Sequence, residues 1–325
     1  MTYDFFRGRR LRRTASIRDL FRENTITAND LMMLYFVAEN DDPEFKAPIK
    51  SMPGQYQLSL NQLEKTVGEA VKNGLKSLML FGIPAEKDPV GSQAYAKDGI
   101  VQQAVKRLKD KWPDLVVTTD VCLCEYTSHG HCGLIKDGFV DNDSTLELLA
   151  QTAISHVEAG ADMVAPSDMM DGRVQAIRQG LDQNGFINTP IMSYAVKYAS
   201  AYYGPFRDAA EGAPKFGDRK TYQMDIANSR EGLREATADM IEGADILMVK
   251  PAGPYLDMVR SLRDSFDLPI AAYQVSGEYS IIKAAGLNGW IDEQAVAMES
   301  LIGIKRAGAD LIMSYFTEDV LKLLG

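Results

Sequence analysis

The feature that most limits how this chain can fold is a short apolar run, often rich in β-branched residues, that recurs eight times. Each run is almost continuously hydrophobic, which is typical of a parallel strand buried on both faces. The runs occupy residues 32–38, 76–82, 115–121, 161–166, 190–196, 244–249, 268–275 and 309–315. Amphipathic helical patterns fill the intervals, at residues 62–73, 92–111, 144–159, 172–184, 228–243, 253–266, 292–307 and 318–324.

Eight strand–helix units in succession, joined by right-handed crossovers, predict an α/β fold of the (β/α)8 TIM-barrel type. Glycine follows three of the predicted helices directly before a strand, as is common at helix C-termini; these residues are Gly160, Gly243 and Gly308. An open, doubly wound sheet is the alternative, but no glycine-rich phosphate fingerprint follows the first strand. We therefore expect an N-terminal arm at residues 1–30, which makes oligomer contacts, and a catalytic TIM barrel at residues 31–325.

Composition narrows the class of protein further. The 325 residues are 46% hydrophobic and 25% charged, which suits one barrel with a large core. No apolar run approaches the roughly 20 residues that span a bilayer, and the chain starts with a polar, basic segment, so we expect a cytoplasmic protein without a membrane partner. A net charge of −10 argues against a nucleic-acid partner, although a local basic cluster can still attract an anionic substrate. We interpret the basic run at residues 7–13 as a solvated or subunit-packing arm.

The active site of a TIM barrel lies at the C-terminal ends of its strands. Polar residues stand at the predicted ends of six strands; they are Asp120, Ser167, Asp168, Lys197, Lys250, Ser276 and Tyr315. Their placement predicts that function is concentrated at this end of the barrel.

Lys197 and Lys250 lie at the ends of neighbouring predicted strands, in the segments MSYAVKYAS and ADILMVKPAG. A lysine is rarely buried without a partner. Neighbouring strands would place both ammonium groups in one cavity, where burial and like charge disfavour the protonated form. A neutral amine is a nucleophile that can form a Schiff base with a ketone. The alternative interpretation is that each lysine reaches solvent or pairs with an acid.

The three cysteines, Cys122, Cys124 and Cys132, fall within eleven residues. An odd number this close together favours a metal site over disulfides. Three thiolates can bind one tetrahedral zinc ion and leave the fourth position to water or substrate, which is the catalytic pattern. His129 and His131 lie in the same segment, and each is a candidate fourth ligand or proton carrier unless it only shapes the loop.

The longest predicted loop, residues 198–228, follows the fifth strand. A loop of this length is usually a lid or a functional insertion. Its polar residues suit a clamp on a substrate carboxylate, with solvated surface charges as the alternative; they are Arg207, Arg219, Lys220 and Gln223. The hydroxyls of Ser276 and Tyr315 are candidates for holding a second carboxylate.

With these residues in view, the sequence closely resembles the porphobilinogen synthase (5-aminolevulinate dehydratase) family over essentially its whole length. Five long motifs carry the resemblance: DVCLCEYTSHGHCG at 120–133, VAPSDMMDGRV at 164–174, MSYAVKYASAYYGPFRDA at 192–209, NSREGLREATAD at 228–239 and LMVKPAGPYLD at 247–257. The resemblance implies a lyase of tetrapyrrole biosynthesis that condenses two molecules of 5-aminolevulinate into porphobilinogen with loss of water.

The resemblance also implies roles for individual residues. Lys250 would form a Schiff base with the molecule that becomes the propionate side of the product, and Lys197 with the molecule that becomes the acetate side. Asp120 and Ser167 would line the catalytic site. One substrate carboxylate would be clamped by Arg207, Arg219 and Gln223, and the other by Ser276 and Tyr315. The catalytic zinc ligands would be Cys122, Cys124 and Cys132.

Two further expectations come from the resemblance alone. Glu235 falls at the position of an allosteric magnesium ligand in many bacterial members, and relatives assemble as homo-octamers through their arms. The competing hypotheses are a class I aldolase, which explains one lysine but neither the second lysine nor the cysteines, and a zinc-binding regulatory protein on a barrel scaffold.

Overall fold

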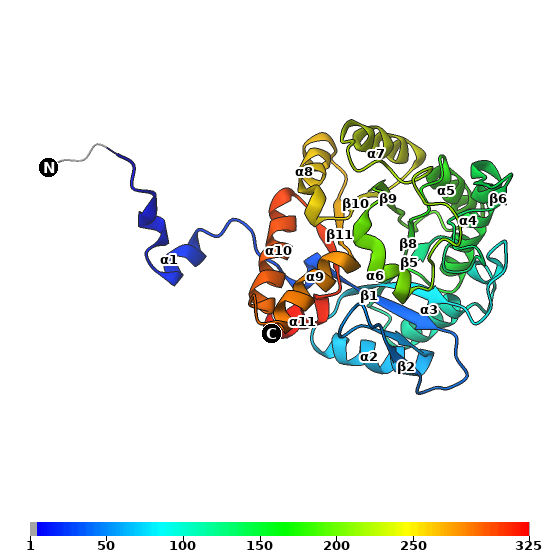
Figure 1. Cartoon of the computed structure of the whole chain (residues 1–325), viewed down its shortest axis with the longest axis horizontal. Helices are drawn as coiled ribbons and strands as arrows, with labels where there is room; N and C mark the ends of the chain where they lie inside the picture. The colour runs from blue at the N-terminus through cyan, green and yellow to red at the C-terminus, as the bar shows by residue number, and fades with distance from the viewer. Residues whose placement is uncertain (1–4, 325) are drawn as a thin grey trace.

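Eight parallel strands form the barrel wall in the computed structural model, which describes residues 5–324 (Figure 1). They are β1 (Leu31–Ala38), β4 (Ser77–Ile83), β5 (Val116–Val121), β8 (Met163–Pro166), β9 (Met192–Lys197), β10 (Ile246–Lys250), β11 (Ile270–Gln274) and β12 (Leu311–Ser314). Hydrogen bonds join them in the order β8-β5-β4-β1-β12-β11-β10-β9. A parallel bridge between Val164 and Ile191 links the two ends of this order. The predicted barrel is therefore confirmed, and the open doubly wound sheet is wrong.

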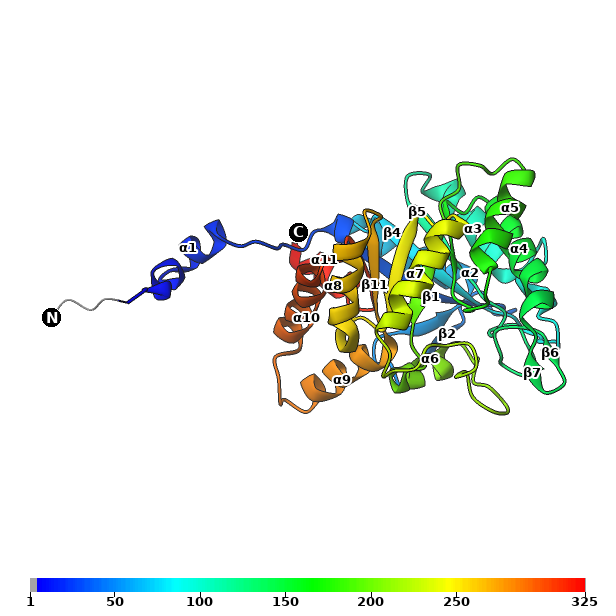
Figure 2. The same ribbon diagram turned by 90° about the horizontal axis from the view of Figure 1, so that it is seen from above.

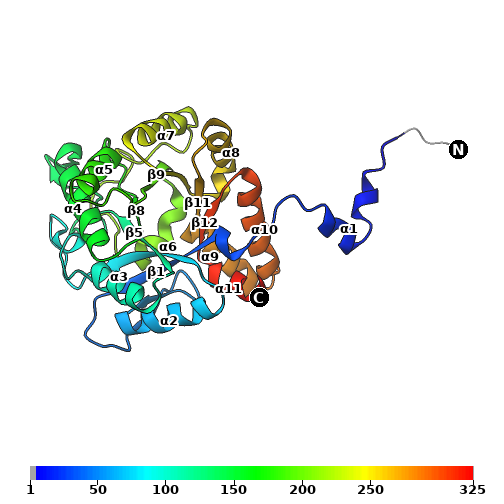
Figure 3. The ribbon, with the colours of Figure 1, turned by 180° about the vertical axis from the view of Figure 1, so that it is seen from behind.

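Each barrel strand is followed by a helix that covers the outside of the wall, and β9 and β11 are each followed by one additional helix (Figures 1 and 3). The helices are α2 (Leu60–Lys72), α3 (Ile100–Lys111), α4 (Asn142–Glu158), α5 (Arg173–Gln183), α7 (Arg230–Glu242), α8 (Leu256–Ser265), α10 (Glu293–Ala307) and α11 (Thr317–Leu324). Their packing follows from amphipathic spacing, as in α2, which buries Leu63, Val67 and Ala70. Gly243 and Gly308 end α7 and α10 with positive φ angles of 108° and 125°, as the sequence pattern predicts.

The continuous hydrophobicity of the strands reflects burial on both faces. All eight residues of β1 are buried. Met32, Leu34 and Phe36 pack in one hydrophobic cluster, whereas the alternating Met33, Tyr35 and Val37 pack in another with residues of α2 and α3. Since successive side chains of a strand point to opposite faces, neither face of β1 tolerates a polar residue without a partner.

Several smaller elements decorate the loops. The predicted helix at 92–111 is divided into η3 (Ser92–Ala94) and α3, because Gly99 stands as the N-cap of α3 and glycine weakens helix propagation. The sequence pattern does not predict α9 (Ser276–Leu287), whose first turn is capped when Glu278 Oε2 accepts a hydrogen bond from Val275 N at 2.7 Å. The loop after β9 carries η4 (Ala201–Tyr203) and α6 (Gly204–Ala209). Remaining short elements are β2 (Lys46–Pro48), β3 (Tyr56–Leu58), β6 (Ile135–Lys136), β7 (Phe139–Val140) and η5 (Gly253–Tyr255).

The segment before β1 projects away from the barrel in all three views (Figures 1, 2 and 3). The projecting part contains η1 (Gly8–Arg12) and α1 (Ala15–Leu20), whereas η2 (Ala28–Asp30) lies against the barrel, where Asp30 accepts a hydrogen bond from Lys305 Nζ at 2.7 Å. None of the three elements buries a residue. Phe6, Leu20 and Phe21 are 92%, 78% and 60% exposed. In the part of the chain that the structure describes, no helix combines the length and the apolar character needed to cross a bilayer.

Candidate active site

Lys197 and Lys250 occupy paired positions at the C-terminal ends of β9 and β10. The register between these strands shifts by one residue at Tyr194 and Ala195, because Leu247 pairs with Ser193 but Val249 pairs with Val196. Residues three apart in a regular strand point to opposite faces. The extra residue in β9 therefore lets Tyr194 and Lys197 face the same interior, where both lysine Nζ atoms lie 5.0–5.4 Å from the Tyr194 ring.

The ammonium group of Lys250 lies within a cage of four aromatic rings. Its Nζ is 4.0 Å from the Tyr273 ring centroid, and 5.0–5.5 Å from those of Tyr194, Phe206 and Tyr203. Desolvation by burial, followed by repulsion from Lys197, lowers the pKa of Lys250 to about 7. The ring faces oppose this shift because they attract a cation. The balance leaves a large fraction of neutral amine near neutral pH.

Lys197, Ser167 and Asp120 form a connected set beside Lys250. Lys197 Nζ donates a hydrogen bond to the main-chain oxygen of Ser167, and Ser167 Oγ donates to Asp120 Oδ2 at 3.0 Å. Burial, and secondly the carboxylate of Glu125, raise the pKa of Asp120 to about 7. Asp120 Oδ1 has no hydrogen-bond partner among the described residues. The four predicted catalytic residues thus lie together, with a carboxyl group able to exchange a proton near neutral pH.

The three cysteines converge as a cluster of buried thiols. Their Sγ atoms all lie within 4.8 Å of one another, and those of Cys122 and Cys124 are 3.3 Å apart. A tetrahedral zinc ion with Zn–S bonds of about 2.3 Å separates its sulfur ligands by roughly 3.8 Å. Hydrogen bonds from Cys122 and Cys124 lower the pKa of Cys132 well below the usual range of a thiol. Burial raises the pKa of the Cys122 thiol, and the pKa of Cys124 is also raised. The three sulfur donors and their spacing fit a thiolate-bound metal.

Glu125 is a buried site residue that the sequence reasoning missed. Its side chain accepts a hydrogen bond from Cys124 Sγ at 3.2 Å, and it forms a second potential ligand group with Asp120 and Cys122. The residue is only 2% exposed. A glutamate directly after the C-x-C motif that follows a predicted buried strand is the signal that indicates it, because an acid is seldom buried without a function or a partner.

His129 and His131 do not face the thiols as further ligands. His129 Nε2 contacts the main-chain oxygen of Pro89 at 3.1 Å. His131 Nδ1 and Nε2 contact the Tyr222 hydroxyl and the Phe216 main-chain oxygen at 3.0 and 2.9 Å. Within the described residues, no potential ligand group includes either histidine.

The basic and amide residues of the loop after β9 carry buried donors that lack acceptors. Among the described residues, no partner exists for Arg207 Nε, Arg219 Nε or Gln223 Nε2. Buried donors are nearly always satisfied in native proteins, so three such groups in one loop indicate a site for an external acceptor. Lys220 differs from its neighbours because its side chain is 76% exposed and lies 4.0 Å from Asp218.

A small cavity of about 20 Å³ brings the lysines and the arginines together. Its walls are Phe81, Cys124, Glu125, Ser167, Lys197, Tyr203, Phe206, Arg207, Arg219 and Lys250. Gln223 lines a separate cavity of about 510 Å³ with Glu231, Glu235 and Asp171. The lysine cavity has room for about one water molecule, so the surrounding loop must move before a substrate enters.

Ser276 and Tyr315 are buried one contact away from the lysine cavity. Ser276 Oγ accepts a hydrogen bond from Phe206 N at 2.9 Å. The hydroxyl of Tyr315 lies 3.0 Å from that of Tyr273, whose ring faces Lys250. Ser276 and Tyr315 are each only 1% exposed, and neither residue lines the cavity directly.

Glu235 lies on α7, away from the lysines. Burial, and secondly the carboxylates of Asp171 and Asp239, raise its pKa. Glu231 and Asp171 share its cavity. These carboxylates are not close enough together to form a ready three-ligand group among the described residues.

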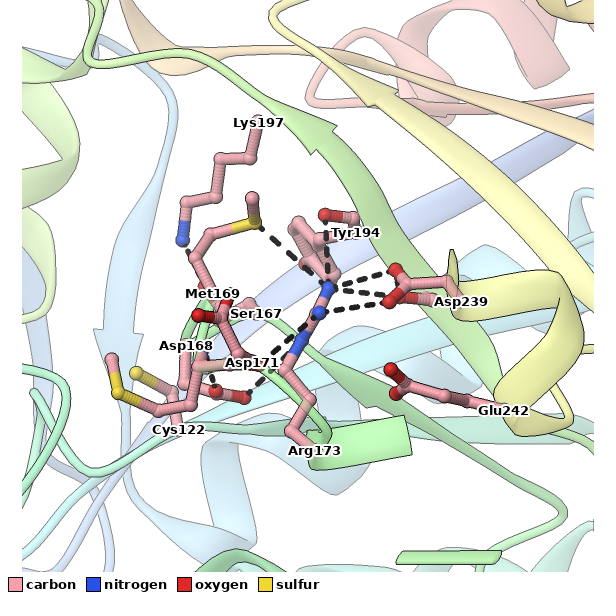
Figure 4. A network of polar contacts seen from close by, with 12 residues as sticks. Cys122, Ser167, Asp168, Met169, Asp171, Arg173, Tyr194, Lys197, Asp239 and Glu242 are labelled. Atoms are coloured by element: carbon pink, nitrogen blue, oxygen red, sulfur yellow. Dashed lines mark hydrogen bonds and ion pairs between the residues drawn. The ribbon is translucent and has the colours of Figure 1, made fainter. Parts of the chain in front are cut away.

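A buried ion-pair network supports the site from behind (Figure 4). Arg173 donates to both carboxylate oxygens of Asp239 at 3.0 Å, to Ser193 Oγ at 3.0 Å and to the main-chain oxygen of Tyr194 at 3.3 Å. Its Nε lies 3.9 Å from Asp168 Oδ2. Burial raises the pKa of Asp168 to about 6. The network ties α5, α7 and β9 together directly beneath the turn that bears Ser167.

The fold and the site define the class of protein: an α/β-barrel enzyme with a pair of buried lysines beside a cluster of thiols. Comparisons with known proteins identify the family within this class. A model of the delta-aminolevulinic acid dehydratase family matches residues 5–323. The chain therefore belongs to that family, which excludes the class I aldolase and the zinc-binding regulator.

Individual relatives agree with the family match. The delta-aminolevulinic acid dehydratase of Halalkalibacterium halodurans is 58% identical over 320 residues, covering 98% of this chain and 97% of that protein. The enzyme of the same name from Staphylococcus aureus is 55% identical over 322 residues, with coverage of 98% and 99%. The crystal structure of delta-aminolevulinic acid dehydratase (porphobilinogen synthase) from Toxoplasma gondii ME49, in complex with porphobilinogen, matches with a TM-score of 0.95 at 45% identity. It covers 98% of this chain and 91% of that chain.

Proposed function

We propose that this chain condenses two molecules of 5-aminolevulinate into porphobilinogen with loss of water, as a hydro-lyase of tetrapyrrole biosynthesis. Family membership gives the enzyme class, and a solved relative holds porphobilinogen as its reaction product. The observation that carries the proposal is the pairing of Lys197 with Lys250 at neighbouring strand ends. Two amines in one pocket can activate two ketones at the same time and hold them at bonding distance.

Lys250 supplies one nucleophilic amine. Its lowered pKa leaves the nitrogen lone pair free to attack the ketone of the substrate that becomes the propionate side. Lys197 binds the substrate that becomes the acetate side in the same way. Each addition gives a carbinolamine, which becomes an imine when its hydroxyl leaves as water after receiving a proton. The contact of Asp120 with Ser167, next to Lys197, suits these two residues to that proton transfer.

The loop residues bind the substrate carboxylates in this proposal. Arg207, Arg219 and Gln223 have buried N–H groups that a carboxylate would satisfy. Ser276 and Tyr315 hold the second carboxylate through their hydroxyls. Since both are one contact away from the lysine cavity, their engagement requires Phe206 and Tyr273 to adjust when substrate enters.

We further propose that Cys122, Cys124 and Cys132 hold a catalytic zinc ion. When bound, zinc supplies a Lewis acid that polarises the acetate-side substrate and lowers the pKa of a bound water. The chain contributes three thiols, of which Cys124 also lines the lysine cavity together with Ser167.

Three further proposals concern a magnesium site, the oligomeric assembly and the location of the protein in the cell. The first two rest on the family resemblance. Glu235 would bind an allosteric magnesium ion, supported by the carboxylates of Glu231 and Asp171 in the same cavity. The division into an arm at 1–30 and a catalytic barrel at 31–325, with a homo-octamer assembled through the arms, is supported by the exposed apolar side chains of the projecting segment. A cytoplasmic location stays a prediction from the sequence.

The reaction and its metals are tested together by porphobilinogen formation from 5-aminolevulinate. Chelator-stripped protein receives zinc, magnesium or both. We expect no activity without zinc, activity with zinc alone, and a further rise when magnesium is added. Full activity with magnesium alone would contradict the zinc assignment, and inactivity under every metal condition would contradict the proposed reaction.

A further inference from the structure

His131 links two parts of the site that are distant in the sequence. It belongs to the cysteine loop, residues 122–133, and it contacts residues 210–224 of the loop after β9, which we call the lid segment. His131 is 3% exposed, and its ring lies 4.5 Å from that of Phe216 between centroids. The chemistry of the proposed function leaves this buried side chain without a role.

The hydrogen bonds of His131 assign its tautomer. The Phe216 main-chain oxygen only accepts, so Nε2, at 2.9 Å, must carry a proton and donate it. In the neutral ring, Nδ1 then accepts a hydrogen bond from the Tyr222 hydroxyl at 3.0 Å. Both ring nitrogens are thus occupied by the lid segment, which leaves neither free to bind a metal or to carry a proton.

Two further hydrogen bonds to main-chain oxygens hold the lid segment against the same loop. Lys215 N donates to the His129 oxygen at 3.0 Å, and Arg219 Nη2 donates to the Gly130 oxygen at 2.9 Å. Gly130 has a φ of +73°, and a Cβ atom there would lie 2.3 Å from the Ala213 oxygen. The two segments therefore approach so closely at residue 130 that only glycine fits there. His131 is the next residue along the chain.

Tyr222 lies between the two predicted carboxylate-binding residues of the lid segment. Gln223 N and Tyr222 N both donate to the Arg219 main-chain oxygen, at 2.9 and 3.3 Å. Fixing the Tyr222 hydroxyl consequently fixes the turn that presents Arg219 and Gln223. Arg219 also lines the lysine cavity, so this turn forms part of the cavity wall.

We propose that His131 is a positioning residue that latches the lid segment closed over the substrates, by bonding Phe216 and Tyr222 at the same time. This inference rests on the proposed carboxylate-binding role of Arg219 and Gln223. Loss of the latch leaves the lysines intact but lowers the population of the closed lid. It therefore weakens substrate binding more than it slows chemistry on bound substrate.

Two variants and a matched control test the latch in the zinc-loaded full chain. His131→Phe keeps the ring packing on Phe216 but removes both hydrogen bonds, and Tyr222→Phe removes one hydroxyl. His129→Asn changes the neighbouring histidine, whose ring nitrogens contact the Pro89 oxygen and His131 N and make no hydrogen bond to the lid segment. Trypsin cleavage after Lys215, Arg219 and Lys220, mapped by mass spectrometry, reports opening of the lid segment independently of activity.

The latch predicts faster cleavage of the lid segment and a roughly 10-fold rise in KM for His131→Phe, because one or two net hydrogen bonds correspond to about a factor of ten in an equilibrium constant. Tyr222→Phe should show a smaller effect in the same direction, with little further loss in the double variant. Parental kcat, zinc content and lid cleavage are expected for His129→Asn.

Unchanged lid cleavage and KM in both His131→Phe and Tyr222→Phe would overturn the latch. So would loss of zinc with a fall in kcat at constant KM, because that result places His131 in the metal site. If His131→Phe does not fold, Tyr222→Phe alone decides by the same two readouts. A parent chain that forms no porphobilinogen contradicts the proposed function, whereas accelerated cleavage in the variants would still establish the latch.

Discussion

Lys250 pairs with Lys197 across β10 and β9, and the register shift at Tyr194 turns both amines to the same interior. If β9 kept the register of Ser193 with Leu247 without a bulge, Lys250 would pair with Val196 and Lys197 would point to the opposite face. The chemistry proposed for this chain thus depends on a local irregularity of one strand.

The lowered pKa of Lys250 predicts an unusual pH dependence. Because the neutral amine is the nucleophile, kcat/KM should rise with pH through about 7 as Lys250 loses its proton. An ordinary lysine, with a pKa of about 10.4, would move this rise above pH 9. The profile is measured with zinc held saturating at every pH. A rise only above pH 9 would show that burial and the neighbouring Lys197 do not favour the neutral amine of Lys250.

The same shift has a consequence for stability. Between about pH 7 and the pKa of about 10.4 in the unfolded chain, the unfolded state binds more protons at Lys250 than the folded state does. The free energy of unfolding should therefore increase with pH across this window. Replacing Lys250 by Met should flatten that dependence in urea titrations at fixed protein concentration. A Met variant with the parental slope would contradict the assignment.

Arg219 should be required for substrate binding. Arg219→Gln removes a guanidinium whose buried Nε has no partner among the described residues. We expect kcat/KM to fall by about 10- to 100-fold, as for loss of a charged hydrogen bond worth about 1.5–3 kcal/mol. Lys220→Gln, which changes the exposed neighbour, is the matched control and should keep parental kinetics. Equal effects of the two substitutions would indicate a general electrostatic role for the loop instead of a clamp.

The buried pair of Arg173 and Asp239 should contribute strongly to stability when only one partner is removed. Asp239→Asn leaves the Arg173 charge buried with only the more distant carboxylates of Asp168 and Glu242, so we expect a loss of about 3–5 kcal/mol in the free energy of unfolding. The double variant Arg173→Met/Asp239→Leu should recover much of that loss. Urea unfolding at one protein concentration measures both. Additive losses in the double variant would mean that the two charges do not act as a pair.

Glu235→Gln should remove stimulation by magnesium while leaving zinc-dependent activity intact. The substitution keeps the size of the side chain but lowers its charge and its affinity for a hard cation. Glu242→Gln, on the same helix but outside the Glu235 cavity, is the control. The test is a magnesium titration of porphobilinogen formation. Stimulation that persists at the parental magnesium concentration would contradict the role of Glu235.

The sequence was sufficient to predict the barrel because its eight buried strands each leave a continuous apolar run, as in β1. The sequence was also sufficient to predict that four residues lie close together, because the C-terminal ends of the strands converge in this fold. These residues are Asp120, Ser167, Lys197 and Lys250. The convergence of the three thiols followed from their closeness in the chain, which leaves little freedom for other arrangements.

Other parts of the site depend on relationships that a linear pattern does not contain. The aromatic cage of Lys250 draws Tyr203 and Phe206 from a loop and Tyr273 from β11, so no spacing rule indicates it. Arg173 resembles an ordinary residue of a first helical turn until its guanidinium is seen beneath β9. His131 makes its hydrogen bonds with Tyr222 and Phe216 only because two segments about 90 residues apart in the sequence pack together.

Reductive trapping tests the central claim most directly. Zinc-loaded protein is mixed with 5-aminolevulinate and sodium borohydride, and the labelled peptides are identified by mass spectrometry. We predict covalent substrate on Lys250 and on Lys197, with the label at Lys250 lost in Lys250→Met. Absence of label from both lysines, while the same protein forms porphobilinogen, would contradict the proposal that paired lysine imines carry the reaction.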